Sequence, residues 1–357
     1  MTGPTYTARV SQPGTTSRVA LALCWLPVGA AMLGVAVWLI WTRWSSLLNA
    51  HPAMLATTIA AGFLGIIALF WAIGSLTVGG RYDAYADDAS GQPQARTPAQ
   101  LRRRARIRVA LGVPALVVCV LLASGLAWAR PFAAAPVATA AMRSGDDIQV
   151  TDRLTWFEMR KVAVSTTGQP ILPTVGLVFV PGARVDPRAY ANVLRPVAEA
   201  GYLVAVVKPP FDLALPNSTQ AASVVENHPE IRHWAVGGHS LGGVAASAYA
   251  DDHPVAGLLL YASYPASELT RTDLITTSVS GSADGLATPA KIAEAKPKLP
   301  EATRYVVVEG GVHAFFGDYG DQPGDGTPTI PRAEAQAQIV KATIELLASL
   351  TPKPKTR

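Results

Sequence analysis

The sequence has few cysteines, and its first 150 residues have no lysine. The sequence has only two cysteines, Cys24 and Cys119, and both lie in long apolar runs. The chain after residue 130 therefore offers no disulfide, no thiol nucleophile and no cysteine-based metal site. Lysine is absent from the first 150 residues, so arginine carries all of the side-chain positive charge there.

Three long segments lack charged residues altogether: 19–41, 52–78 and 109–129. A helix rises about 1.5 Å per residue, so roughly 20 apolar residues cross a bilayer. We therefore predict a membrane region over 19–130 that contains three transmembrane helices with these bounds. A cleaved signal peptide is the alternative for the first segment, but its apolar run is longer than a usual signal core, which favours an uncleaved anchor.

The arginines predict the orientation. Seven of them lie between Gly79 and Arg108, whereas the loop after the first apolar segment has only Arg43. Short basic loops stay in the cytoplasm, which places the N terminus inside and everything after about Arg130 outside. We expect a multi-pass protein of the cell membrane whose C-terminal domain is extracytoplasmic. Residues 82–100, within the basic loop, are predicted to lack a fold of their own.

The basic balance of the chain comes from this loop. Residues 1–150 carry a net charge of +7 and residues 151–357 a net charge of −2, although the pI of the whole chain is about 9.2. The larger part of the chain thus has no basic surplus with which to bind phosphates, and we predict no nucleic-acid partner. The lipid bilayer is the expected partner of the first part. No oligomeric state is predicted.

Composition divides the rest of the chain. Residues 1–18 are predicted to be a disordered polar tail, and the Ala- and Pro-rich residues 131–150 a tether. Residues 151–350 are predicted to form a globular domain, followed by a basic tail over 351–357.

Within the globular domain, short apolar runs alternate with helical segments. Expected strands are 154–164, 175–180, 203–207, 233–236, 256–261, 275–280 and 305–308, and expected helices are 187–200, 220–226, 241–250, 289–295 and 333–350. This alternation predicts an α/β fold with a mostly parallel sheet flanked by helices. Ligands bind such sheets outside the carboxyl ends of the strands.

A Gly-x-Ser-x-Gly pentapeptide, residues 238–242, follows one of these strands and opens a helix. The pattern is typical of a nucleophile elbow, in which two glycines leave room for a sharp turn that exposes Ser240 above the sheet. The alternative is a tight strand-to-helix turn in which the serine only caps the helix.

A serine nucleophile needs a base, and the base needs a carboxylate. Among the histidines after Ser240, His313 follows a predicted strand, whereas His253 lies at the far end of the helix that Ser240 opens. Asp284 follows the preceding strand in a Gly-rich loop; Asp273 lies at the wrong end of that strand, and Asp318 breaks the chain order Ser, Asp, His. The alternatives are a turn residue for Asp284 and a loop histidine for His313.

An acyl carbonyl also needs preorganised donors for its developing negative charge. The backbone N–H of Leu241 opens the helix and is one expected donor. The backbone N–H of Ala183, after the predicted strand 175–180, is the other. This chemistry needs no metal and no cofactor.

Several motifs in this order resemble those of alpha/beta hydrolase family 5, a group related to the dienelactone hydrolases. The matching pieces are Phe179–Tyr190, Gly237–Gly243, Gly281–Gly285, Gly310–Gly320 and Asp321–Asp325. The resemblance covers about Gly176 to Leu347 and implies an α/β-hydrolase fold with Ser240, Asp284 and His313 as nucleophile, acid and base. The chain departs from many esterases at Pro181, where they carry the histidine of a His-Gly oxyanion motif. It has a serine where dienelactone hydrolases have a cysteine, which favours ester hydrolysis over lactone opening.

The sequence thus predicts a membrane-anchored serine hydrolase that cleaves an ester or similar acyl bond of a small-molecule substrate through an acyl-enzyme. Two alternatives stay open. One is a non-catalytic sensor or scaffold with the same fold, and the other is an acyltransferase that uses the same three residues.

Overall fold

The structure is a computed structural model, and it describes residues 13–77, 85–87, 92–214 and 220–351. The chain divides into two compact units. One comprises Met1–Trp44 and Leu55–Arg130, and the other comprises Ser45–Met54 and Pro131–Arg357.

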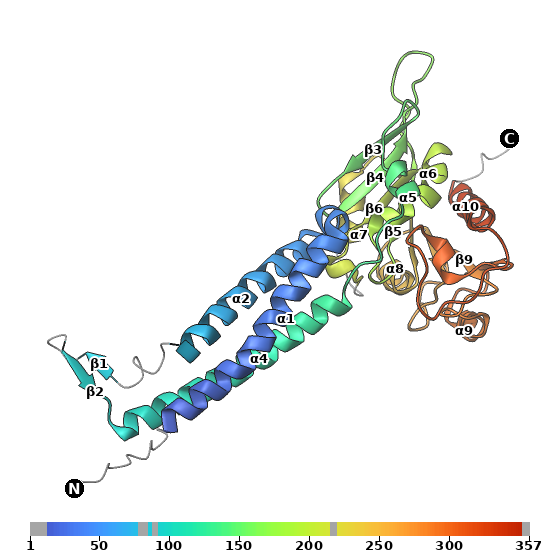
Figure 1. Ribbon diagram of the computed structural model, residues 1–357. Helices are drawn as coiled ribbons and strands as arrows, with labels where there is room; N and C mark the ends of the chain where they lie inside the picture. The colour runs from blue at the N-terminus through green and yellow to red at the C-terminus, as the bar shows by residue number, and fades with distance from the viewer. Residues whose placement is uncertain (1–12, 78–84, 88–91, 215–219, 352–357) are drawn as a thin grey trace, which may run out of the picture. The chain divides into compact units, whose positions relative to one another are not determined.

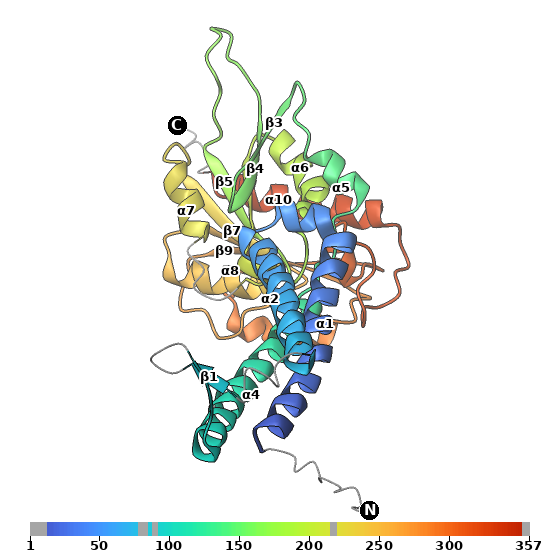
Figure 2. The same ribbon diagram turned by 60° about the vertical axis from the view of Figure 1, so that its left-hand side comes forward.

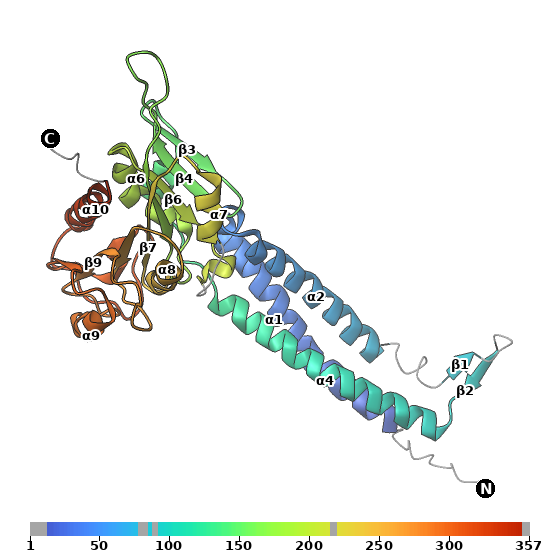
Figure 3. The same cartoon turned by 180° about the vertical axis from the view of Figure 1, so that it is seen from behind.

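Three long apolar helices dominate the first unit: α1 (Pro13–Asn49), α2 (Pro52–Thr77) and α4 (Pro98–Trp128). They run side by side in Figures 1 and 3, and all three are long and apolar enough to cross a membrane. Helix α1 contains its predicted segment, and so does α2, except that residue 78 lies outside the described residues. Helix α4 ends at Trp128, one residue before the predicted end at 129. The tail predicted over 1–18 is wrong in its last part, because α1 begins at Pro13; residues 1–12 lie outside the described part of the chain.

Small residues bring α1 and α2 close together. A Cβ added to Gly65 would lie 2.8 Å from the carbonyl oxygen of Gly29, so a larger residue does not fit there. Nearby, the rings of Trp25 and Trp71 meet edge to face with their centroids 6.4 Å apart. Lipid tails are as apolar as the helices themselves, so close backbone packing of this kind is what holds apolar helices together in a bilayer.

The prediction that residues 82–100 lack a fold is wrong at two places. Strand β1 (Tyr85–Asp87) pairs antiparallel with β2 (Pro93–Ala95). Helix α4 then begins at Pro98, because Thr97 accepts the Gln100 N–H through its hydroxyl while the Gln100 side chain accepts the Thr97 N–H. This reciprocal capping box starts the helix before the arginines rather than after them.

The second unit contains an eight-stranded sheet, and the expected α/β-hydrolase fold is confirmed (Figure 2). The strand order is β10-β9-β8-β7-β5-β6-β4-β3, with β5 to β10 parallel and β3 and β4 antiparallel. The strands are β3 (Ile148–Asp152), β4 (Trp156–Lys161), β5 (Val175–Val180), β6 (Leu203–Val207), β7 (His233–His239), β8 (Gly257–Tyr261), β9 (Ile275–Gly281) and β10 (Arg304–Val308). The order reverses at β5, which has β6 on one side and β7 on the other, so ligands are expected above the ends of β5 and β7.

Helices cover both faces of this sheet, as Figures 2 and 3 show. The helices are α6 (Ala191–Glu199), α7 (Gln220–Asn227), α8 (Leu241–Asp252), α9 (Pro289–Ala295) and α10 (Arg332–Ser349), with short 3₁₀ turns at η1 (Pro187–Tyr190), η2 (Pro210–Asp212), η3 (Lys296–Lys298) and η4 (His313–Phe316). Alternate residues of β5 point to opposite faces, so Leu177 joins the core under α6 and α10 while Val178 joins the core under α7 and α8. Both faces being buried explains why β5 and β6 are apolar throughout.

The tether predicted over 131–150 is wrong, because the structure packs this segment into the second unit. Helix α5 (Pro136–Ala141) buries Ala138 and Ala141, and residues 148–152 form the edge strand β3. Phe132 packs on the ring of Tyr319 at 5.9 Å, and its N–H donates to the carbonyl of Arg184. The small alanine side chains let α5 approach α6 closely. An amino-acid composition that is typical of linkers therefore forms a packed helix in this segment.

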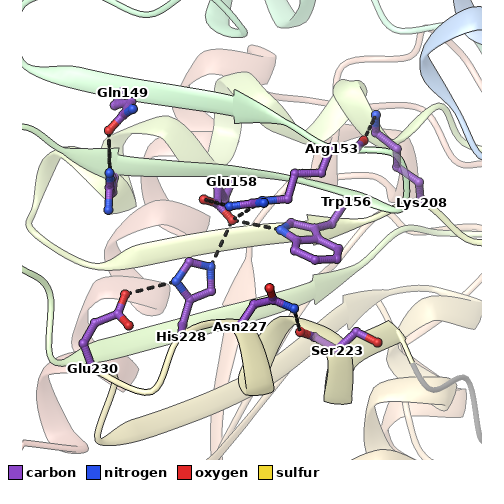
Figure 4. Close-up of polar contacts among 10 residues, drawn as sticks. Gln149, Arg153, Trp156, Glu158, Lys208, Ser223, Asn227, His228 and Glu230 are labelled. Atoms are coloured by element: carbon purple, nitrogen blue, oxygen red, sulfur yellow. Dashed lines mark hydrogen bonds and ion pairs between the residues drawn. The ribbon is translucent and has the colours of Figure 1, made fainter.

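A buried polar cluster surrounds Glu158 of β4 (Figure 4). One carboxylate oxygen of Glu158 accepts hydrogen bonds from Trp156 Nε1 at 2.8 Å and His228 Nε2 at 3.0 Å. The other ring nitrogen of His228 donates to Glu230 at 3.0 Å. Although burial alone raises it, the pKa of Glu158 is lowered by His228 and Trp156 to about 2 from an ordinary 4.5. The hydrogen bond to Glu158 raises the pKa of His228 above 6.5, against the effect of burial.

These shifts predict how the stability of the protein depends on pH. The Glu158 contribution is present above pH 4.5 and is lost as the pH falls toward 2; the His228 contribution is present below pH 6.5 and is lost as the pH rises through its raised pKa. We expect Glu158→Gln to lower Tm by about 5 °C between pH 5 and 6, and by less at pH 3 and pH 9. Scanning fluorimetry on the intrinsic tryptophan signal measures this. The control is Glu199→Gln, whose exposed pair with Arg195 should contribute little at any pH.

Candidate active site

Backbone strain is concentrated at the carboxyl ends of the parallel strands. Five non-glycine residues in the described part of the chain have a positive φ: Arg184, Phe211, Asp212, Ser240 and Ala262. They follow β5, β6, β7 and β8, so every one lies in a loop at the same edge of the sheet. Such conformations cost free energy and cluster at functional sites, which makes this edge of the sheet the candidate site.

Ser240 occupies the turn between β7 and α8. Its φ of 53° and ψ of −125° lie outside the helical region, and its side chain makes no capping hydrogen bond to α8, which argues against a role as a helix cap. The end of β8 fixes the turn, because the Ser240 N–H donates to the carbonyl of Tyr261 and the Ser263 hydroxyl donates to the carbonyl of Ser240 at 2.6 Å. The strained serine is therefore held through both its N–H and its carbonyl.

Asp284 and His313 form a buried pair. The distance from His313 Nδ1 to Asp284 Oδ2 is 2.8 Å, and both side chains are almost fully excluded from solvent. The other carboxylate oxygen, Oδ1, accepts the N–H groups of Leu286 and Ala287 at 2.7 Å each. Both carboxylate oxygens are thus committed, and Asp284 holds the proton of His313 on Nδ1, which leaves Nε2 free to accept a proton.

Ser240 and His313 line the same cavity. It has a volume of about 240 Å³, and its other lining residues are Leu241, Val244, Ala262, Ser263, Tyr264, Leu286 and Ala287. His313 Nε2 is buried and has no hydrogen-bond partner among the described residues. A ring nitrogen of His313 that has no partner among the described residues thus shares a cavity with the strained serine, as proton abstraction from Ser240 would require.

The two expected oxyanion donors come from neighbouring loops. Neither the Leu241 N–H nor the Ala183 N–H donates a hydrogen bond to another residue in the described ranges. Gly242 lets these loops meet, since a Cβ added there would lie 2.2 Å from the carbonyl oxygen of Val180 and 2.3 Å from that of Pro181. Leu241 lines the cavity, whereas Ala183 is not among the described residues that line it.

Comparison with known proteins identifies this part of the chain. Residues 176–337 match the sequence model of the Alpha/beta hydrolase family. The chain carries an alpha/beta hydrolase domain. The match includes the elbow, Asp284 and His313. No curated protein sequence matches the chain.

Solved structures are similar to the alpha/beta hydrolase domain at low sequence identity. XC6422 from Xanthomonas campestris, an α/β serine hydrolase without a lid, is 13% identical, with 59% of this chain and 98% of that chain covered and a TM-score of 0.40. A Klebsiella pneumoniae protein described as a dienelactone hydrolase is 13% identical, with 56% and 98% covered and a TM-score of 0.39. Esterase B from Lactobacillus rhamnosis is 12% identical, with 59% and 90% covered and a TM-score of 0.39.

The hydrolase domain also contains positioning residues that the sequence did not single out. Asp325 accepts the N–H groups of His313 at 3.0 Å, Ala314 at 2.8 Å and Gly285 at 3.2 Å. It therefore ties the loop that carries His313 to the loop that carries Asp284. The only signal for it in the sequence was its place at the end of the last motif that resembles the family.

His239 packs against His313 and forms part of its support. Its Nδ1 lies 2.9 Å from the hydroxyl of Tyr190, and that hydroxyl accepts the Gly182 N–H at 2.9 Å. The Tyr190 hydroxyl can therefore donate its hydrogen bond to His239 Nδ1. A ring nitrogen that accepts a hydrogen bond carries no proton, so this histidine is neutral. Burial lowers the pKa of His239 well below 6.5, and so does the nearby His313. The His239 ring packs on the His313 ring with centroids 4.5 Å apart, so a neutral ring supports that of His313 without adding a second positive charge beside it.

The residues that the sequence set aside lie elsewhere in the hydrolase domain. His253 follows the last turn of α8, where its Nδ1 is bonded to the carbonyl of Tyr249. Asp273 pairs with Arg271 before β9 begins. Asp318 is buried and accepts hydrogen bonds from Asn192 and Gln336. None of the three lines the cavity of Ser240.

Proposed function

We propose that this protein is a serine hydrolase that cleaves carboxylic esters, with Ser240 as nucleophile, His313 as general base and Asp284 as the residue that orients the base. The observation that carries the proposal is the buried Asp284–His313 pair, whose free Nε2 shares a cavity with the strained Ser240. The alpha/beta hydrolase family match over residues 176–337 supports it.

The reaction would proceed in two halves. Ser240 Oγ attacks the ester carbonyl while His313 Nε2 takes its proton, and the negative charge on the carbonyl oxygen is stabilised by the N–H groups of Leu241 and Ala183. The tetrahedral intermediate collapses, His313 returns the proton to the departing alkoxide, and an alcohol leaves. A water molecule then attacks the acyl-enzyme, again losing its proton to His313, and the acid departs as Ser240 regains its hydrogen.

The cavity favours a short acyl group. Its volume of about 240 Å³ is below the roughly 300 Å³ at which pockets for drug-sized ligands begin. Beside the polar side chains of Ser263, Tyr264 and His313, the lining consists of small or aliphatic side chains, including Val244, Ala262 and Ala287, which offer apolar contact. A short aliphatic acyl chain matches both the size and the character of this lining.

We also propose that α1, α2 and α4 cross the cell membrane and leave the hydrolase domain outside the cytoplasm. The length and apolar composition of the helices support insertion. The arginines of the loop that contains the first turns of α4 support the orientation, because short basic loops remain in the cytoplasm. A phosphatase reporter that is active only in the periplasm is expected to be active when it is fused after residue 351. An inactive phosphatase, with activity of a cytoplasm-dependent reporter fused at the same position, would contradict the orientation.

Labelling with a fluorophosphonate probe tests the enzymatic proposal on the full chain in detergent. Phosphonylation requires an activated serine, so we expect wild-type protein to be labelled, and peptide mapping by mass spectrometry to place the adduct on Ser240. The variant Ser263→Ala, which loses the other serine of the cavity, should still be labelled. No adduct on folded protein would favour a non-catalytic scaffold, and an adduct on another residue would contradict the assignment of the nucleophile.

A further inference from the structure

A second cavity adjoins the catalytic one. Its volume is about 270 Å³, and it is lined by Tyr264, Lys291, Glu294, Ala295 and Lys298. Tyr264 lines the catalytic cavity as well. The loop after β8 thus borders both cavities through Tyr264, while the other lining residues of the second cavity belong to α9 and η3.

The two lysines of this second cavity are held in place by backbone carbonyls. Lys291 Nζ donates to the carbonyl of Leu286 at 2.9 Å, and Lys298 Nζ donates to the carbonyl of Ala266 at 2.9 Å. An ammonium group has three N–H donors, so each lysine keeps two for a ligand. Among the described residues neither lysine forms an ion pair with a carboxylate.

Lys291 is also fixed relative to the catalytic residues. The residue whose carbonyl it contacts, Leu286, donates its N–H to Asp284 Oδ1 at 2.7 Å and lines the catalytic cavity. One residue therefore connects the ammonium group of the second cavity to the carboxylate of the first. This arrangement would keep the distance between the cationic site and the reacting carbonyl constant from one substrate to the next.

We propose that the second cavity binds a carboxylate at the far end of the acyl chain, so that the preferred substrates are esters of short dicarboxylic acids. This inference rests on the proposed esterase function. The catalytic cavity supplies apolar contact for the chain, while Lys291 and Lys298 supply the only cationic groups among the lining residues. Glu294 reduces the net charge of the lining to +1, which suits a monoanionic carboxylate better than a dianionic phosphate.

Matched esters test this inference. The 4-nitrophenyl hemiesters of dicarboxylic acids with four to eight carbons are compared with neutral 4-nitrophenyl alkanoates of equal chain length. We expect wild-type protein to prefer one hemiester length over its neutral partner in kcat/KM. The double variant Lys291→Gln/Lys298→Gln should lower this ratio about tenfold, since two partly exposed charge contacts are lost. Glu294→Gln should raise the ratio, because it removes the opposing charge.

The control variant is Lys341→Gln, which removes a lysine from the exposed face of α10 and should leave the ratio unchanged. Turnover of the neutral ester shows that each variant is folded. A hemiester preference that persists in the double variant, or one that Lys341→Gln reduces equally, would overturn the anion site. Failure of wild-type protein to hydrolyse either series of esters would instead reject the esterase function on which the inference rests.

Discussion

Replacement of Asp284 by asparagine is expected to lower kcat for ester hydrolysis about 10⁴-fold. The reason lies in how the carboxylate is held. Oδ1 accepts the N–H groups of Leu286 and Ala287, so the single oxygen of an asparagine amide must take that place. The amide NH₂ then faces His313 Nδ1 and donates to it. This moves the ring proton to Nε2, and a protonated Nε2 no longer accepts the proton of Ser240.

The measurement for Asp284→Asn is kcat with a 4-nitrophenyl ester near neutral pH, with the fold checked by circular dichroism. Asp273→Asn is the matched control, since it makes the same chemical change at a side chain that is 70% exposed and outside the cavity. It should change kcat by less than about twofold. A loss of less than tenfold in Asp284→Asn would show that His313 is oriented by something other than this carboxylate.

The central strands were predictable because burial on both faces makes them apolar throughout. The structure reproduces the predicted bounds of Val175–Val180 and Leu203–Val207, and α9 begins and ends at the predicted Pro289 and Ala295. Edge strand β3 was missed for the opposite reason. Of its five residues only Ile148 is buried, and the rest of the strand is polar or partly exposed, so its pattern is that of a loop.

Only those features of the site that follow from the order of residues along the chain were predictable. The order Ser240, Asp284, His313 and the glycines around each residue lie in the linear sequence, and they predicted which loops meet. The supports of the site come from distant segments. Asp325 accepts hydrogen bonds from backbone N–H groups. Nearly every residue type has such a group, so the residues that contact Asp325 need no particular side chain and leave no pattern in the sequence.

The segment at 131–150 shows where composition misleads. Alanine and proline are typical of a linker, and the same small side chains allow α5 to pack closely on α6. Its edge strand and the contact of Phe132 with Tyr319 add further cohesion. The hydrolase domain therefore begins at about residue 131, some 20 residues before the predicted boundary at 151.

Gly242→Ala is expected to reduce both stability and activity, because the glycine lets the first turn of α8 lie against the loop after β5. The added Cβ would lie 2.2 Å from the Val180 carbonyl oxygen and 2.3 Å from that of Pro181, and a backbone carbonyl yields only if its whole loop moves. We expect a loss of about 1–3 kcal/mol or more in the free energy of unfolding, which is typical of an overpacked site.

The same displacement would separate the Leu241 and Ala183 N–H groups, and loss of one oxyanion donor typically lowers kcat by about 10²-fold to 10³-fold. Urea unfolding and ester turnover measure the two effects on one preparation of Gly242→Ala. The matched control is Gly145→Ala, where the nearest atom to the added Cβ is 3.8 Å away, at the end of the flexible side chain of Arg195. If Gly242→Ala keeps wild-type kcat while its stability falls, the contact between the two loops serves folding alone, and the oxyanion donors must lie elsewhere.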